Sequence, residues 1–154
     1  MRKAFSALLA VCLILGVFTA CAAPAPKANY DLEALSSKIS DSAAFSDILS
    51  PVNPEIAASF FGYDAADISE CKVLCSTGAT TEEISLFKCS DEAAAERVLG
   101  FAKKRAQSQK TAYQSYAPDE VPKIDNAIIR SEGVYVFYIV STDSAKVEAA
   151  ISGK

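Results

Sequence analysis

The sequence of 154 residues contains no histidine and no tryptophan. Histidine is the commonest general base and a frequent zinc ligand, so its absence removes the usual nucleophile-activating and zinc-binding arrangements. Glycine-rich phosphate loops and the G-x-S-x-G nucleophile motif are also missing from the chain. We therefore expect a protein that is not an enzyme and that carries no cofactor and no metal, with an enzyme that works without histidine as the alternative.

Basic residues are scarce in the first half of the chain. Residues 27–90 carry 4 basic and 10 acidic side chains, and the whole sequence has a formal net charge of −4. An acidic surface is repelled by phosphate backbones, so we predict that nucleic acid is not a partner.

The N-terminus has the pattern of a targeting signal. Two basic residues precede an apolar run over residues 4–18, which ends in Phe-Thr-Ala-Cys21. A basic region, an apolar region and small residues ahead of a cysteine are typical of a lipoprotein signal peptide. We predict that residues 1–20 are the signal peptide and that acyl chains such as palmitate, attached at Cys21, anchor the protein stably. The expected location is the extracytoplasmic face of the cell membrane.

Two alternatives remain for this segment. Cleavage after the Ala20-Cys21-Ala22 sequence would secrete the protein, whereas an uncleaved run over residues 4–23, about 20 residues long, would be just sufficient to cross a bilayer. In the lipoprotein interpretation, residues 21–28 form a stiff Pro/Ala tether. Residues 29–154 then form a single domain.

The mature domain has an odd number of cysteines, Cys71, Cys75 and Cys89, which cannot all pair internally. Cys71 and Cys75 lie four residues apart on a predicted strand, about 13 Å along one face. We predict that all three are small buried apolar side chains. One alternative is a disulfide between Cys71 and Cys89, which requires that Cys75 lie opposite Ser85 in the hairpin. The other is a thiolate metal site, which no histidine could complete.

Hydrophobic periodicity and turn residues predict an α+β fold. Asn53 as N-cap, Pro54 at the first helical position and Gly62 after the last indicate a short helix. The last predicted strand, residues 134–141, is apolar at almost every position, which favours an interior place in the sheet. The remaining predicted elements are a helix near residues 32–39, strands at 68–76, 83–89 and 126–131, a long helix from 90 to about 113, a connector at 114–125 and a closing helix at 142–151.

These elements form two successive strand-strand-helix units. We therefore predict a four-stranded, mainly antiparallel sheet packed by one long helix, with short N-terminal helices.

Three segments carry a family resemblance: residues 78–84, residues 116–123 running into Asn126, and residues 133–135. In this order they resemble the bacterial lipoprotein family described as domain of unknown function 4358. The resemblance implies an envelope lipoprotein with an α+β domain. It implies no activity and no catalytic residues.

Two segments are candidates for binding. The connector 116–123 has prolines that reduce the entropy cost of ordering and a flat tyrosine ring, and the turn 78–83 has free amides and hydroxyls. The structural alternatives are a stiffened crossover with Tyr116 in the core, a hydrogen-bonded hairpin turn, and a Gln109 side chain bonded to a loop backbone. The candidate residues for a ligand or partner are Gly78, Thr80, Glu83, Gln109, Tyr116, Asp119 and Tyr135.

We thus expect a non-enzymatic binding or accessory domain that meets an unknown envelope protein or a small ligand. The alternative is a structural subunit that docks on a membrane complex through an apolar patch. Phe60, Phe61 and Tyr63 would supply that patch if they lie outside the core.

Overall fold

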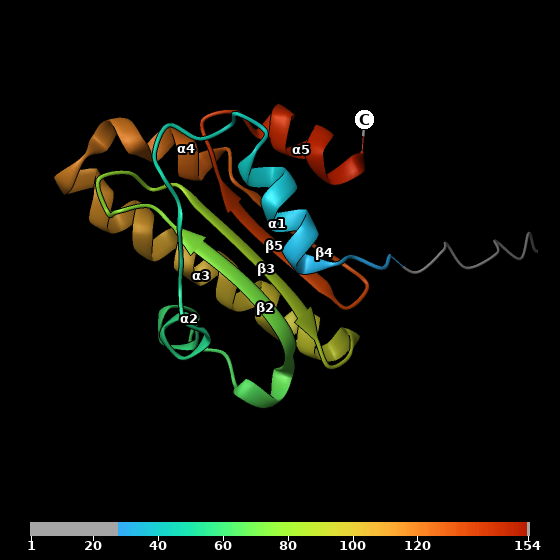
Figure 1. The fold of residues 1–154 in the computed structure, drawn as a ribbon. Coiled ribbons are helices and arrows are strands. Elements are labelled where there is room, and N and C mark those ends of the chain that lie inside the picture. The colour runs from blue at the N-terminus through green and yellow to red at the C-terminus, as the bar shows by residue number, and fades with distance from the viewer. Residues whose placement is uncertain (1–27, 154) are drawn as a thin grey trace, which may run out of the picture.

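A five-stranded antiparallel sheet lies at the centre of the computed structural model, which describes residues 28–153 (Figure 1). The strand order is β1-β2-β3-β5-β4. The strands are β1 (Ser50–Pro51), β2 (Ile68–Cys75), β3 (Glu83–Cys89), β4 (Ile128–Glu132) and β5 (Tyr135–Val140). The α+β class is confirmed, but the predicted number of four strands is wrong. Because β1 has 2 residues and one is a proline, it shows no alternation that a sequence pattern could reveal.

Helices cover both faces of the sheet. Figure 1 shows α3 behind the strands and α1 in front of them. One buried cluster lies between the sheet and α2 with α3, and the other between the sheet and α1 with α5. The helices are α1 (Leu32–Ser40), α2 (Pro54–Phe61), α3 (Glu92–Tyr116), α4 (Val121–Asp125) and α5 (Ser144–Ser152), with 3₁₀ turns at Ala65–Asp67 and Pro118–Glu120.

The final strand, β5, is interior as predicted. All six of its residues are buried, and it lies between β3 and β4. The α3 crossover allows this order because it carries the β4–β5 hairpin to the free side of β3 with β5 innermost.

The predicted connector at 114–125 is more helical than expected. α3 continues to Tyr116, a 3₁₀ turn follows at Pro118–Glu120, and α4 begins at Val121. The two prolines occupy first-turn positions, where a missing amide hydrogen costs nothing.

The register of the β2–β3 hairpin differs from the one that a disulfide required. Cys75 lies opposite Glu83, so Cys71 lies opposite Phe87. This shift of two residues keeps every side chain on its face, because the period of a strand is two, but it moves Cys71 away from Cys89. The Cys71–Cys89 bridge is therefore not formed, and the three cysteines of the described residues are free thiols.

Candidate functional site

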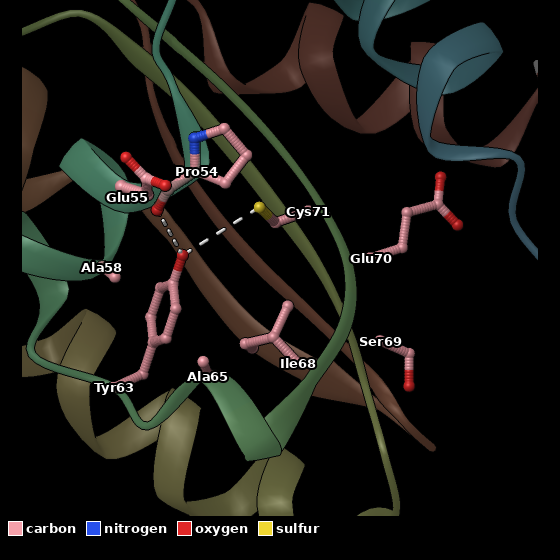
Figure 2. Close-up of a pocket in the computed structure, with 9 residues that line it drawn as sticks. All are labelled: Pro54, Glu55, Ala58, Tyr63, Ala65, Ile68, Ser69, Glu70 and Cys71. Atoms are coloured by element: carbon pink, nitrogen blue, oxygen red, sulfur yellow. Dashed lines mark hydrogen bonds between the residues drawn. The ribbon is translucent and has the colours of Figure 1, made fainter.

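An open pocket of about 370 Å³ lies between α2 and β2 (Figure 2). Tyr63 forms one wall, and the thiol of Cys71 faces the space from β2. The lining residues are Pro54, Glu55, Ala58, Tyr63, Ala65, Ile68, Ser69, Glu70 and Cys71.

The local sequence explains why the chain leaves this space. The Asn53 side chain accepts a hydrogen bond from the Glu55 amide at 2.8 Å and starts α2 one residue before Pro54. Gly62 ends the helix with φ 75°, a left-handed conformation that glycine adopts without strain. The chain therefore turns back sharply toward β2, and the small side chain of Ala58 leaves the gap between helix and strand unfilled.

Tyr63 places a hydroxyl in the wall of the pocket. Its ring is buried against Phe87, with ring centroids 5.5 Å apart, and its hydroxyl donates to the Pro54 carbonyl at 3.3 Å. The hydroxyl also lies 3.9 Å from the Cys71 Sγ. Burial raises the pKa of Tyr63 above its usual range, so the group stays a neutral phenol.

The charges around the pocket are all acidic. Glu55 and Glu70 are exposed carboxylates at its rim, and no lysine or arginine is among the lining residues. Figure 2 shows that Ser69 and Glu70 project from the side of β2 that faces away from Tyr63 and Ala58. The pocket thus has an apolar interior and a carboxylate on each side of its strand wall.

The strand wall is also a sheet edge. β1 pairs only with Leu74 and Cys75 of β2, and the Val52 amide adds one bond to the Val73 carbonyl at 2.9 Å. Within residues 28–153, no strand pairs with the outer edge of β2 between Ile68 and Lys72. Sequence reasoning missed this pocket, although Pro54 and Gly62 had marked the helix that forms it.

The predicted turn and connector do lie together, at the other end of β2. The Thr81 amide donates to Glu120 Oε2 at 2.9 Å, and the Tyr113 hydroxyl donates to the Thr80 carbonyl at 2.8 Å. Lys123 Nζ lies 3.0 Å from Glu82 Oε1 and 2.8 Å from Glu120 Oε1. We call this group, comprising Thr80, Thr81, Glu82, Tyr113, Glu120 and Lys123, the turn–connector cluster.

The polar groups of the turn–connector cluster are bonded to one another. Buried Glu82 accepts from the amides of Ser46 and Asp47, each at 2.9 Å, and from the Ser46 hydroxyl at 2.6 Å. Burial acts to raise the pKa of Glu120, but the hydrogen bonds from Lys123 and Thr81 outweigh it and lower this pKa. The cluster therefore holds the turn 78–83 against the connector, and the hydrogen bonds named here use its polar groups within the protein.

Predicted residues Glu83 and Gln109 belong to a buried network on the sheet. The Glu83 carboxylate accepts from Arg105 Nη2 at 2.6 Å, from the Ser85 hydroxyl at 2.6 Å and from Gln109 Nε2 at 3.2 Å. The Gln109 side chain also accepts from the Tyr138 hydroxyl. Gln109 thus bonds side chains of two strands, and neither a loop backbone nor an open cavity.

The other predicted residues are dispersed. Tyr116 is 72% exposed beside the turn–connector cluster, and Asp119 is exposed on the adjoining 3₁₀ turn. Tyr135 does not join them, because it is buried under Tyr30 at the opposite end of the sheet, paired with Lys88. Gly78 lies in the turn, and its carbonyl accepts from the Tyr113 hydroxyl at 3.0 Å.

The predicted apolar patch is mostly core. Phe61 and Tyr63 are buried, whereas Phe60 is 44% exposed with the Arg105 guanidinium 4.7 Å from its ring centroid. Ile56 lies one turn earlier on α2 and is 50% exposed.

The predicted signal peptide, the predicted lipidation site Cys21 and the predicted tether up to residue 27 fall outside the described residues. Among residues 28–153, no helix is long and apolar enough to span a membrane. In the same range, no group of three or more acidic or cysteine side chains is arranged to hold a metal ion.

Comparison with known proteins found one family. A sequence model described as "Domain of unknown function (DUF4358)" matches residues 41–141, a range that includes the α2–β2 pocket and the turn–connector cluster. No curated protein matches the chain. No solved structure matches it either.

Proposed function

Because the chain belongs to the family described as domain of unknown function (DUF4358), whose description names no activity, we propose a function from the geometry of the α2–β2 pocket. The protein is an envelope lipoprotein held at the outer face of the cell membrane through Cys21. Its domain is a non-enzymatic binding or accessory module that receives the apolar part of a ligand between α2 and β2.

The pocket is the observation that carries this proposal. Its volume of about 370 Å³ falls within the range of small-ligand and side-chain pockets, and its interior is lined by Ala58, Tyr63 and Ile68. The Tyr63 hydroxyl supplies one polar group at the wall. An apolar surface with few polar groups favours a site that binds the apolar part of a ligand and orients it through one hydrogen bond.

The buried charges of the domain support the same interpretation. Glu82 and Glu83 are each paired with a cation and further hydrogen-bond donors, and neither lines the pocket. Neutralised in this way, they are typical of structural ion pairs rather than of a reactive centre.

Disulfide tethering tests the pocket. The full-length protein in detergent micelles would be treated with small apolar disulfides at alkaline pH, because burial raises the pKa of Cys71 above its usual range. We expect Cys71, which lines the pocket, to be captured several times faster than Cys75, which does not. Intact mass and peptide mapping measure the labelled site.

Ala58→Phe should suppress this capture by filling the pocket, whereas Ala112→Phe, at an exposed position on α3, should not. Equal labelling of Cys71 in the wild type and in Ala58→Phe would contradict a ligand pocket at this place.

The proposed anchoring has its own test. Protein from the membrane fraction should have the mass of a chain that begins at Cys21 with a diacylglyceryl adduct. An unmodified chain that begins at Met1 or at Ala23 would refute lipid anchoring and leave the pocket unaffected.

A second candidate function is docking on a membrane complex through the outer face of α2. Ile56 and Phe60 lie four residues apart and are 50% and 44% exposed, so they share one face of the helix. In native electrophoresis of solubilised membranes, Ile56→Ser should release the protein from a larger complex if this function holds. Ala58→Phe should release it only if the complex uses the pocket.

A further inference from the structure

The open edge of β2 offers backbone hydrogen-bonding groups beside the pocket. The Val73 carbonyl accepts from Val52, so the backbone groups of Val73 point away from β3. Because strands alternate with a period of two, the amide and carbonyl of Cys71 point to the same side. β1 ends before it reaches Cys71, so these groups adjoin the pocket with no strand beside them among the described residues.

We propose that β2 receives an extended peptide segment of a partner protein as an added strand along Ile68–Lys72, with one apolar side chain of that segment in the α2–β2 pocket. This inference rests on the proposed function of the pocket. Strand addition suits such an edge, since backbone bonds hold the segment while a side pocket selects one of its residues.

The charges on the two sides of β2 specify the chemistry of that segment. Side chains of an added strand alternate between the two faces of the sheet, so those on one face enter the pocket and their neighbours lie beside Glu70 (Figure 2). Glu70 is exposed and makes no ion pair within residues 28–153, whereas the adjacent Lys72 is bound to Glu33 at 2.5 Å. Opposite charges across neighbouring strands attract, so a lysine or arginine fits beside Glu70.

Glu55 strengthens this preference. It lies at the rim of the pocket on α2 and is exposed, and the lining contains no basic side chain to balance it. The occupant is therefore an extended segment in which cationic and apolar side chains alternate, and an acidic segment is repelled.

A labelled peptide in which lysine and valine alternate is the direct probe. Fluorescence anisotropy with the full-length protein in detergent micelles measures its binding. We expect Glu70→Gln to weaken binding by about fivefold, the effect of one cross-strand ion pair. Glu96→Gln removes an exposed carboxylate on α3, outside the pocket, and should change nothing.

Two modified peptides separate strand addition from simple charge attraction. N-methylation of alternate residues on the pairing side removes several backbone bonds and should weaken binding on the order of 100-fold. Replacement of lysine by glutamate should abolish binding. If the N-methylated peptide binds as well as its parent, the segment does not add to the sheet and the inference is overturned.

The outcome is distinct from that of the tethering experiment. Capture of apolar disulfides at Cys71 without peptide binding would overturn strand addition and leave the pocket function standing. A concentration-dependent dimer in sedimentation velocity that excludes the peptide would assign the β2 edge to a second copy of the chain and also overturn the inference.

Discussion

Both faces of the central sheet carry an apolar core, but the α2/α3 face also buries an ion pair between a strand and a helix. On β3, Ile84 and Leu86 face α1 and α5 and lie in an aliphatic and aromatic core. The alternate residue Glu83 faces α3 and holds a buried ion pair with Arg105. The free thiols and the α2–β2 pocket lie on this second side as well.

This difference separates the contribution of apolar packing from that of the buried ion pair between Glu83 and Arg105. Close-packed apolar side chains stabilise wherever they meet, so the buried clusters on both faces are expected to form the core. A buried ion pair stabilises little relative to apolar residues of similar volume, but it penalises any arrangement that separates its partners. We therefore predict that apolar packing on both faces supplies the net stability, and that the buried ion pair on the α2/α3 face contributes register.

The largest effect should come from breaking the ion pair on one side only. Arg105→Met leaves the carboxylate of Glu83, 1% exposed, without a cation, and should lower the free energy of unfolding by about 3–5 kcal/mol. The double variant Glu83→Met/Arg105→Met should recover most of that loss. Urea unfolding of the full-length protein, followed by far-UV circular dichroism, measures both.

A surface pair provides the control for this experiment. Lys72→Met removes the ion pair with Glu33, whose side chain is 72% exposed, and should cost less than about 1 kcal/mol. If the single and double variants of the buried pair are equally unstable, the pair itself stabilises the fold and the contrast between the two faces is wrong.

A cavity on the opposite face should have a similar but somewhat smaller effect. Ile84 is fully buried between β3 and the α1/α5 layer, so Ile84→Ala should lower the free energy of unfolding by about 2–4 kcal/mol. Unlike the loss caused by Arg105→Met, this loss of stability should not be recovered by replacing Glu83 with Met. Tethering at Cys71 should survive this change, because Ile84 points away from the pocket.

The smallest predicted effect is a loss of stability at acidic pH that comes from two carboxyl groups on the 3₁₀ turns. The ion pair with Arg97 holds the pKa of Asp67 below its usual range, and the Glu120 pKa is lowered in the same direction. A carboxyl whose folded pKa is depressed stabilises the protein above its unfolded pKa, near 4, and this contribution is lost as the pH falls through the lower folded value. Stability should therefore fall below about pH 4.

The variants Asp67→Asn and Glu120→Gln identify the source of this loss. Each should reduce the difference between urea midpoints measured at neutral and acidic pH, while Ile84→Ala should shift both midpoints equally. An unchanged pH dependence in both carboxyl variants would place the acid sensitivity elsewhere in the molecule.

Local signals in the sequence were sufficient for most elements. Asn53, Pro54 and Gly62 determine the ends of α2 through local bonds and a single backbone angle, and the structure confirms all three. The boundaries of β3 were also predictable, because a glycine-containing loop precedes it and the helix start at Asp91 follows it. The interior place of β5 follows from its run of apolar residues. Such features depend on neighbours in the chain.

The features that were not predicted depend on contacts between distant residues. Cys75 pairs with Glu83 rather than Ser85, in a hairpin whose turn bonds to a distant segment through Thr81 and Glu120. From the sequence, the Gln109 side chain was expected to bond a loop backbone or a ligand. Its partners are instead Glu83 and Tyr138, which lie on two separate strands. No spacing along the chain reveals these pairs.

By itself, the sequence determined the α+β class, the helix caps, the family and the proposal of a lipid anchor, because each depends on residues close together in the chain. Only the tertiary structure decided the fifth strand, the hairpin register and the position of the pocket. The pocket exists because α2 stops at Gly62 and β1 stops at Pro51, which leaves the Ile68–Lys72 edge of β2 without a neighbouring strand among the described residues. That vacancy results from where elements end in space, and no single segment of the sequence contains it.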